Sequence, residues 1–153
     1  MIVEWQGLPD LSGRVTMIGG GFDPFHDGHI EYIAAGATLG PPVLCNVEPD
    51  SYVATKHPVL LPQAERIKVL DALRDVTYVH PSSASTEAVL EQLRPRYFVK
   101  GMDWKGRLPA VEQRICSEHR IEVVYVDTVI NSSSALISDF LDRCRAAADG
   151  AGG

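Results

Sequence analysis

The stretch that decides the fold is RVTMIGGGFDPFHDGH, residues 14–29. It opens with an apolar run, residues 14–19, whose length and composition are typical of a short buried β-strand. Three glycines, Gly19 to Gly21, end this run, and a helix is expected to begin near residue 27. Because glycine has no Cβ, the backbone at this turn can approach another group closely. The stretch therefore predicts a strand, a glycine turn and a helix in direct succession.

The same alternation continues toward the C-terminus. Further apolar runs predict strands at residues 43–47, 76–79, 97–100 and 121–126. Amphipathic stretches between and after them predict helices at residues 63–73, 86–93, 109–119 and 133–145. Strands that alternate with helices form a parallel sheet covered on both faces. We therefore expect an α/β, Rossmann-like, doubly wound parallel sheet of five strands with helices on both faces.

The remaining segments complete the expected organisation. Residues 1–13 are expected to be an irregular lead-in and residues 48–62 a long loop, of the kind that often carries function. The Ala- and Gly-rich residues 146–153 are expected to form a flexible tail. The chain of 153 residues fits one domain, with its core between about residues 14 and 145.

The composition narrows the classes of function. The net charge of −6 argues against a protein that coats nucleic acid, which would normally be basic. No apolar run approaches the length of a membrane span, and the first residues lack a signal-peptide pattern. Three scattered cysteines without a CxxC spacing favour reduced thiols. We expect a cytoplasmic protein with neither a nucleic-acid partner nor a membrane partner.

Residues suited to chemistry follow the predicted strands. In parallel sheets, ligands bind beyond the carboxyl ends of the strands. The segments at that edge would be residues 20–29, Lys56, residues 101–104 and residues 132–134. The sequence therefore predicts a ligand site built from several loops.

Two histidines at the start of the first helix suit bound phosphate. His26 and His29 are three residues apart and can lie on one helix face, with Gly28 between them leaving room for a phosphate. The helix N-terminus adds free N–H groups and a positive dipole end. Imidazoles that donate hydrogen bonds suit oxygens that gain charge in phosphoryl or nucleotidyl transfer. The alternatives are a tight turn with two surface histidines, or a metal site with His57 as a third ligand.

The segment GGFDPFHDGH, residues 20–29, resembles the GxFDxxHxGH signature of the cytidylyltransferase-like nucleotidyltransferase superfamily. That superfamily includes glycerol-3-phosphate and ethanolamine-phosphate cytidylyltransferases and the adenylyltransferase part of the ADP-heptose synthesis enzyme. Residues 98–104, FVKGMDW, are similar to its VKGxD[WY] segment, and Glu65-Arg66 to its ER-helix stretch. Residues 131–136, NSSSAL, stand in the place of its serine motif. The resemblance covers about residues 15–141.

This resemblance implies roles for individual residues. His26, His29 and Lys56 would be catalytic. The residues that would bind the nucleotide are Gly20, Gly21, Phe22, Asp23, Gly28, Lys100, Gly101, Asp103, Trp104, Ser132, Ser133 and Ser134. The serines would also cap the last helix. Arg66 is open to two interpretations, a site residue or a structural ion pair.

The implied reaction transfers a nucleoside monophosphate from a nucleoside triphosphate to a small phosphate- or phosphonate-bearing acceptor, with release of pyrophosphate. Mg²⁺ would accompany the triphosphate. Residues 125–130 lack the arginine that phosphoalcohol cytidylyltransferases tend to carry there, and Ala135 replaces a position that is often basic. CMP transfer is the preferred interpretation. Its alternatives are AMP transfer of the sugar-phosphate (heptose) type and a non-catalytic nucleotide-binding module. Because many relatives dimerise, a homodimer is expected.

Overall fold

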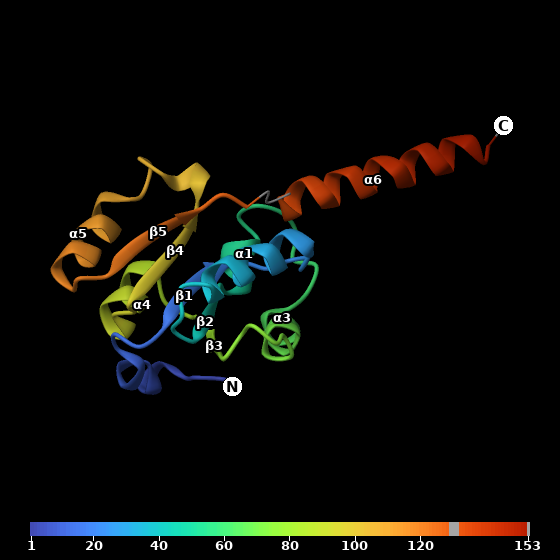
Figure 1. The fold of residues 1–153 in the computed structure, drawn as a ribbon. Helices are drawn as coiled ribbons and strands as arrows, with labels where there is room; N and C mark the ends of the chain where they lie inside the picture. The colour runs from blue at the N-terminus through green and yellow to red at the C-terminus, as the bar shows by residue number, and fades with distance from the viewer. Residues whose placement is uncertain (129–131, 153) are drawn as a thin grey trace.

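A parallel β-sheet forms the centre of the molecule (Figure 1). The computed structural model describes residues 1–128 and 132–152, and within them the sheet has five strands in the order β3–β2–β1–β4–β5. The strands are β1 Thr16–Gly20, β2 Val43–Val47, β3 Tyr78–Pro81, β4 Tyr97–Gly101 and β5 Glu122–Val126. All neighbouring strands pair in parallel. The predicted fold class is confirmed.

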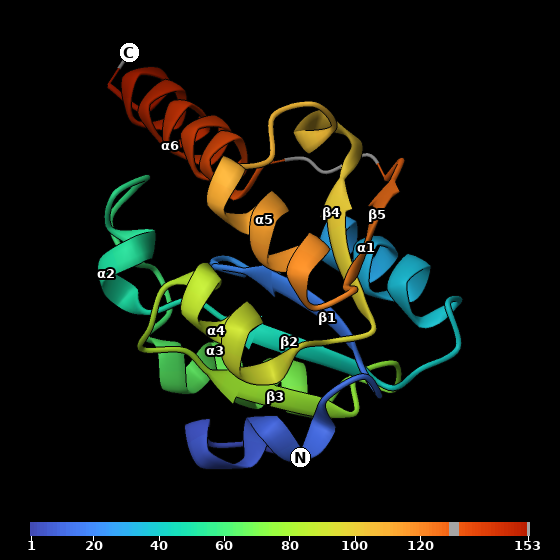
Figure 2. The same ribbon diagram turned by 90° about the vertical axis from the view of Figure 1, so that its left-hand side faces the viewer.

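Helices cover both faces of this sheet, as Figure 2 shows. The helices are α1 Asp27–Ala37, α2 Asp50–Val53, α3 Gln63–Asp71, α4 Thr86–Leu93, α5 Ala110–Glu118 and α6 Ser133–Gly150, with 3-10 turns at Trp5–Leu11 and Met102–Trp104. Successive side chains along a strand point to opposite faces of the sheet, so β1 contributes to a hydrophobic core on each face. Met17 packs with Leu90 and Ile115 of α4 and α5. Ile18 packs with residues of α1 and α3 on the opposite face.

The order of the strands creates a switch point beside β1. The chain runs outward from β1 through β2 to β3, then returns so that β4 pairs with the other edge of β1. In sheets of this kind the connections leave a crevice at the carboxyl ends where the order reverses. The ends of β1 and β4, at Gly20 and Gly101, therefore define where a ligand is expected.

The structure differs from the sequence-based expectation at several element boundaries. The lead-in forms a 3-10 helix, because Leu8 is fully buried against the α4 side of the sheet. The long loop contains the short helix α2. Strand β3 begins at Tyr78 rather than residue 76, where it pairs with Leu44 of β2. Helix α6 continues to Gly150, and the alanines at 146–148 are strong helix formers.

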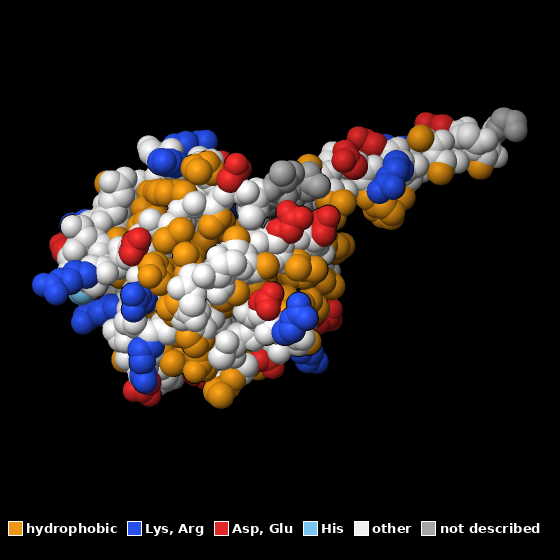
Figure 3. All heavy atoms as spheres, viewed as in Figure 1, with side chains coloured by type: hydrophobic (Ala, Val, Ile, Leu, Met, Phe, Trp, Pro, Cys, Tyr) orange, Lys and Arg blue, Asp and Glu red, His pale blue; other side chains and the backbone are white. Residues whose placement is uncertain are grey.

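Helix α6 projects from the body of the molecule (Figures 1 and 3). None of its residues, all of which the structure describes, is buried. Leu136, Phe140 and Leu141 are among its exposed apolar side chains. In the described part of the chain, no helix is both long and apolar enough to cross a membrane.

Candidate active site

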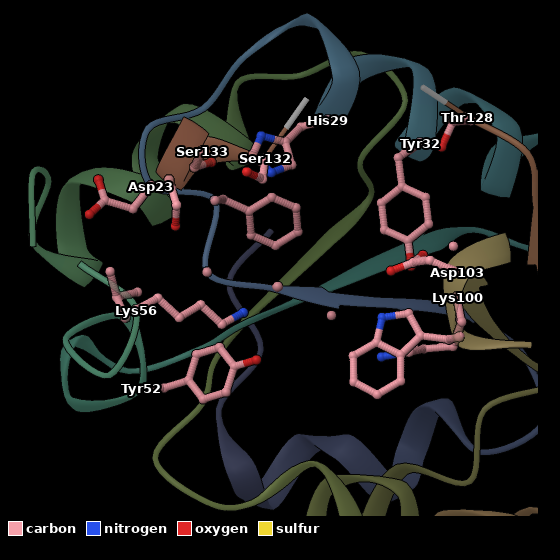
Figure 4. A pocket seen from close by; sticks show the side chains of 18 of the residues that line it. Asp23, His29, Tyr32, Tyr52, Lys56, Lys100, Asp103, Thr128, Ser132 and Ser133 are labelled. Carbon is pink, nitrogen blue, oxygen red and sulfur yellow. The ribbon is translucent and has the colours of Figure 1, made fainter. Parts of the chain in front are cut away.

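A cavity of about 620 Å³ lies beyond the carboxyl ends of β1 and β4 (Figure 4). Its walls come from the glycine turn after β1, the start of α1, the loop around α2, the segment after β4 and the start of α6. The structure brings together all but two of the residues that the sequence predicted. Those that line the cavity are Gly20, Gly21, Phe22, Asp23, His29, Lys56, Lys100, Gly101, Asp103, Trp104, Ser132, Ser133 and Ser134. The exceptions are His26 and Gly28.

The two histidines do not enter the cavity side by side. His26 has an extended backbone as the N-cap of α1, with φ −149° and ψ 176°, and its ring stacks on His29 at 3.9 Å between centroids. Only 8% of the His26 side chain is exposed, whereas His29 reaches the cavity. His26 therefore packs behind His29 and does not itself line the cavity.

The surroundings of His29 fix its tautomer and its charge. The backbone N–H of His26 donates to Nδ1 of His29 at 3.3 Å, so the proton of the neutral ring sits on Nε2. Burial, and secondarily the charge of His26, lower the pKa of His29 to about 3. At neutral pH, His29 is therefore an uncharged hydrogen-bond donor.

Close packing shapes the glycine turn before α1. Phe22 has a left-handed backbone, φ 54°, and its ring packs edge-on to His29 at 5.2 Å between centroids. A Cβ on Gly20 would lie 3.3 Å from the Phe22 ring. A Cβ on Gly21 would lie 3.1 Å from Cγ2 of Val53, which belongs to α2. The glycines let the turn pack against its own aromatic ring and against α2.

Asp23 holds the loop between α2 and α3 in place. It is 1% exposed, and its two carboxylate oxygens accept hydrogen bonds from the backbone N–H groups of Leu60 and Leu61, at 2.7 and 2.8 Å. Because both carboxylate oxygens of Asp23 accept these backbone hydrogen bonds, Asp23 fixes the position of the loop. Asp23 also lines the cavity.

The structure answers the question that the sequence left open for Arg66. This side chain is 1% exposed and donates to the carbonyl oxygens of Leu61, Gly21 and Glu48 at 2.9, 2.6 and 2.8 Å. It also pairs with Asp50. Arg66 therefore has a structural role: it connects the glycine turn to the segment after β2 and to the first residue of α2.

Two lysines point into the cavity from opposite sides, as Figure 4 shows. Nζ of Lys56 lies 4.6 Å from the ring centroid of Tyr52. Nζ of Lys100 lies 4.0 Å from the ring centroid of Trp104. Burial lowers the pKa of Lys100, and the nearby carboxylates of Glu112, Asp103 and Glu48 oppose that shift. Positive charge is thus available on both sides of the glycine turn.

The N-terminus of α6 closes the cavity near α1. Oγ of Ser132 accepts from the backbone N–H of Ala135 at 3.1 Å, which confirms the predicted N-cap. Oγ of Ser133 donates to the carbonyl of Pro24 at 3.0 Å and fixes the helix start against the glycine-turn segment. A helix N-terminus offers free N–H groups to anions. Asn131, the first residue of the serine motif, lies outside the described residues.

A family model described as cytidylyltransferase-like matches residues 17–139, which include every wall of this cavity. The chain belongs to the cytidylyltransferase-like family. Membership in this family places the protein among the nucleotidyltransferases.

Curated relatives of this cytidylyltransferase-like chain include larger proteins. The bifunctional protein HldE of Nitrosococcus oceani is 36% identical over 94 residues, which are 59% of this chain and 20% of that protein. HldE of Shewanella amazonensis is 30% identical over 136 residues, which are 85% of this chain and 28% of that protein. The matched part of the chain thus spans between a fifth and just over a quarter of the length of these relatives.

Solved structures share the fold. A lipopolysaccharide core biosynthesis protein from Thermoplasma volcanium superposes with a TM-score of 0.63 at 19% identity, over 76% of this chain and 98% of that one. Pantoate-beta-alanine ligase from Francisella tularensis gives 0.58 at 11% identity, over 87% of this chain and 71% of that one.

Several cavity residues of the cytidylyltransferase-like chain were not among the predicted catalytic or nucleotide-binding residues. They are Gly19, Tyr32, Tyr52, Val53, His57, Met102, Asp127 and Thr128. Tyr32 follows His29 by three residues on α1, a spacing that could have revealed it, and its hydroxyl donates to the carbonyl of Val99 at 2.7 Å. The metal site that His57 would complete is not supported. Among the described residues, the group of metal-ligating atoms lies on the surface at Glu91, Glu118 and His119.

Proposed function

We propose that the protein transfers a nucleoside monophosphate from a nucleoside triphosphate to a small phosphate- or phosphonate-bearing acceptor, releasing pyrophosphate. The supporting observation is that the cavity gathers the Nε2–H donor of His29, the ammonium groups of Lys56 and Lys100, and the N-terminus of α6. Each of these groups stabilises negative charge. Such a set suits a triphosphate whose outer phosphates depart as pyrophosphate.

The chemistry needs no covalent intermediate on the protein. An oxygen of the acceptor phosphate attacks the α-phosphorus, the bond from that phosphorus to the β-bridging oxygen breaks, and pyrophosphate leaves. Catalysis then comes from positioning and charge stabilisation. His29 donates from Nε2 to the phosphate oxygens that gain charge, and Lys56 neutralises charge near the α-phosphate. His26 positions His29 through its stacked ring and its backbone N–H.

The other walls suggest where the remaining parts of the nucleotide lie. Ser132, Ser133 and Ser134 at the start of α6 would hold the β- and γ-phosphates, and the segment from Gly101 to Trp104 would contact the nucleoside. Mg²⁺ would enter with the triphosphate, because it retains waters and needs few protein carboxylates. The exposed carboxylates of Asp103 and Asp127 line the cavity and suit that ion, which would offset triphosphate charge.

The identity of the base is a finer part of the proposal. The FVKGMDW segment favours CTP, in line with the sequence-based preference. The HldE matches favour ATP and a sugar-phosphate type of acceptor, because they connect the chain to the ADP-heptose branch. The acidic Asp127 before the serine motif favours the same branch. We therefore propose ATP and CTP as the two donors to compare directly.

Pyrophosphate release tests this function. The protein is mixed with ATP or CTP and with a panel of phosphate acceptors, and pyrophosphate is measured by a coupled assay. The proposal expects release that requires one donor and one acceptor together. Nucleotide binding by thermal shift, without release for any acceptor, would instead establish the non-catalytic nucleotide-binding module.

A further inference from the structure

A buried carboxylate of α5 lies close to the active-site cavity but is not part of its wall. Glu112 is 6% exposed and lines a second hollow of about 520 Å³. Lys100 lines both this second hollow and the active-site cavity. Lys100 therefore presents its positive charge both to Glu112 and to whatever the active-site cavity binds.

The carboxylate of Glu112 depends on nearby charge rather than on hydrogen bonds. Its Oε2 is buried and has no hydrogen-bond partner among the described residues. An ionised carboxylate in such a place is costly unless a positive charge lies nearby. Burial raises the pKa of Glu112, the charge of Lys100 opposes this shift, and the charge of Glu87 from α4 adds to it. Lys100 is thus the positive charge that compensates the burial of Glu112.

Glu112 is in turn the leading negative charge that acts on Lys100. Burial lowers the pKa of Lys100, and Glu112 opposes this shift most strongly, followed by Asp103 and Glu48, whereas Lys56 adds to it. These groups come from α5, the 3-10 turn after β4, the segment after β2 and the segment after α2. Glu112 and Lys100 are therefore each other's main partner in charge.

The ammonium group of Lys100 is held over aromatic rings and not by an ion pair. Its Nζ lies 4.0 Å from the ring centroid of Trp104 and 5.5 Å from that of Phe98. The ion pairs of the described residues do not include Lys100. Attraction to an aromatic face and to a carboxylate across the hollow leaves the N–H groups of Lys100 to a bound phosphate.

The neighbouring carboxylate of Glu48 has neutral partners of its own. Its Oε1 accepts from Nδ2 of Asn46 at 3.4 Å and from the hydroxyl of Thr86 at 3.3 Å. Hydrogen bonds to the charged form stabilise a carboxylate without a cation. Of the two buried glutamates, Glu112 is therefore the one whose negative charge depends more on Lys100.

We propose that Glu112 is a positioning residue of the nucleotide site. Its buried carboxylate is the counter-charge that keeps the ammonium group of Lys100 charged and in place over the Trp104 ring, at the wall that a triphosphate meets. This inference rests on the proposed function and adds to it a residue that does not line the active-site cavity. Glu112 acts through Lys100 and makes no contact with the nucleotide.

Nuclear magnetic resonance of the full chain without nucleotide tests the charge pair. The Cε–H resonances of Lys100 are assigned by their loss in Lys100→Met and are followed from about pH 7 to about pH 11. In Glu112→Gln, the midpoint of this titration should fall by about one pH unit, because the negative charge that favours the ammonium form is gone. Glu118→Gln should leave the midpoint unchanged and is the matched control, since Glu118 is an exposed carboxylate on the same helix.

A double-mutant cycle tests whether Glu112 acts through Lys100. The affinities for ATP and for CTP are measured by calorimetry in wild type, Glu112→Gln, Lys100→Met and the double variant. We expect Glu112→Gln to weaken binding of the preferred nucleotide by about threefold to tenfold, and to have no further effect in the Lys100→Met background. Glu112→Asp keeps the charge and should bind nucleotide more like wild type than Glu112→Gln, which keeps the shape.

The outcomes separate this inference from the proposed function. An unchanged Lys100 midpoint in Glu112→Gln would refute the charge pair. A loss of affinity that persists in the Lys100→Met background, or a Glu112→Gln variant that binds nucleotide better than Glu112→Asp, would show that Glu112 acts through packing and overturn its role. If the midpoint shifts as expected and wild type binds neither ATP nor CTP, the proposed function fails and the role of Glu112 fails with it, although the charge pair stands.

Discussion

Replacing His29 by alanine tests the central contact of the proposed mechanism. His29 presents Nε2–H to the cavity because its Nδ1 accepts from the backbone N–H of His26 at 3.3 Å. Removing one preoriented donor to a transition-state oxygen costs about 2.7–4 kcal/mol, or about a hundredfold to a thousandfold in kcat. We expect a loss of that size with the active donor and acceptor. His119→Ala is the control, because His119 pairs with Glu91 outside the cavity.

The pH dependence of kcat and of the free energy of unfolding gives a second test of His29. A pKa of about 3 keeps His29 neutral, so kcat should not fall as the pH drops through 6.5 on account of this residue. Protonation of His29 in the unfolded chain begins near pH 6.5, ahead of the folded state. The free energy of unfolding should therefore decrease as the pH falls from about 6.5 toward 3, by up to about 1.4 kcal/mol per pH unit. His29→Ala should remove this slope.

Two measurements test whether His29 is a neutral hydrogen-bond donor. Proton NMR follows the Cε1–H resonance of His29 between pH 8 and pH 4, and urea denaturation gives the free energy of unfolding over the same range. A His29 resonance that titrates near pH 6.5, or a kcat that falls there in wild type and in the His119→Ala control alike, would refute the assignment of a neutral donor. Near-normal turnover in His29→Ala would refute the role itself.

Three further predictions concern residues that shape or line the cavity. Arg66→Met should lower the free energy of unfolding by about 3–5 kcal/mol in urea denaturation, because it leaves buried acceptors and Asp50 without their partner; a loss under about 1 kcal/mol would contradict the anchoring role. Gly21→Ala should reduce the thermal shift that nucleotide produces, since its Cβ would press on Val53 at 3.1 Å, and an undiminished shift would count against a tight turn. Lys56→Met should lower turnover while changing stability by less than about 0.5 kcal/mol, because Lys56 is exposed; an unchanged kcat would exclude it from catalysis.

Much of the fold was predictable because local hydrophobic patterns in the sequence indicate its strands and helices. Strand β2 is a short apolar run that matches its predicted residues 43–47, because every side chain in it is buried. Strand β3, Tyr78–Pro81, contains His80 and begins two residues after its predicted start. The 3-10 helix at Trp5–Leu11 was missed because it depends on a single buried residue, Leu8, between Gly7 and Pro9. Burial of one side chain against a distant helix leaves no periodic signal in the sequence.

The site was predictable where the motif fixes the backbone, and not where tertiary contacts decide the role. The glycine turn, His29 and the Ser132 cap follow from local sequence. The orientation of His26 depends on its packing behind His29, and the role of Asp23 depends on Leu60 and Leu61, which lie 37 and 38 residues away. Contacts over such separations become visible only in the folded chain.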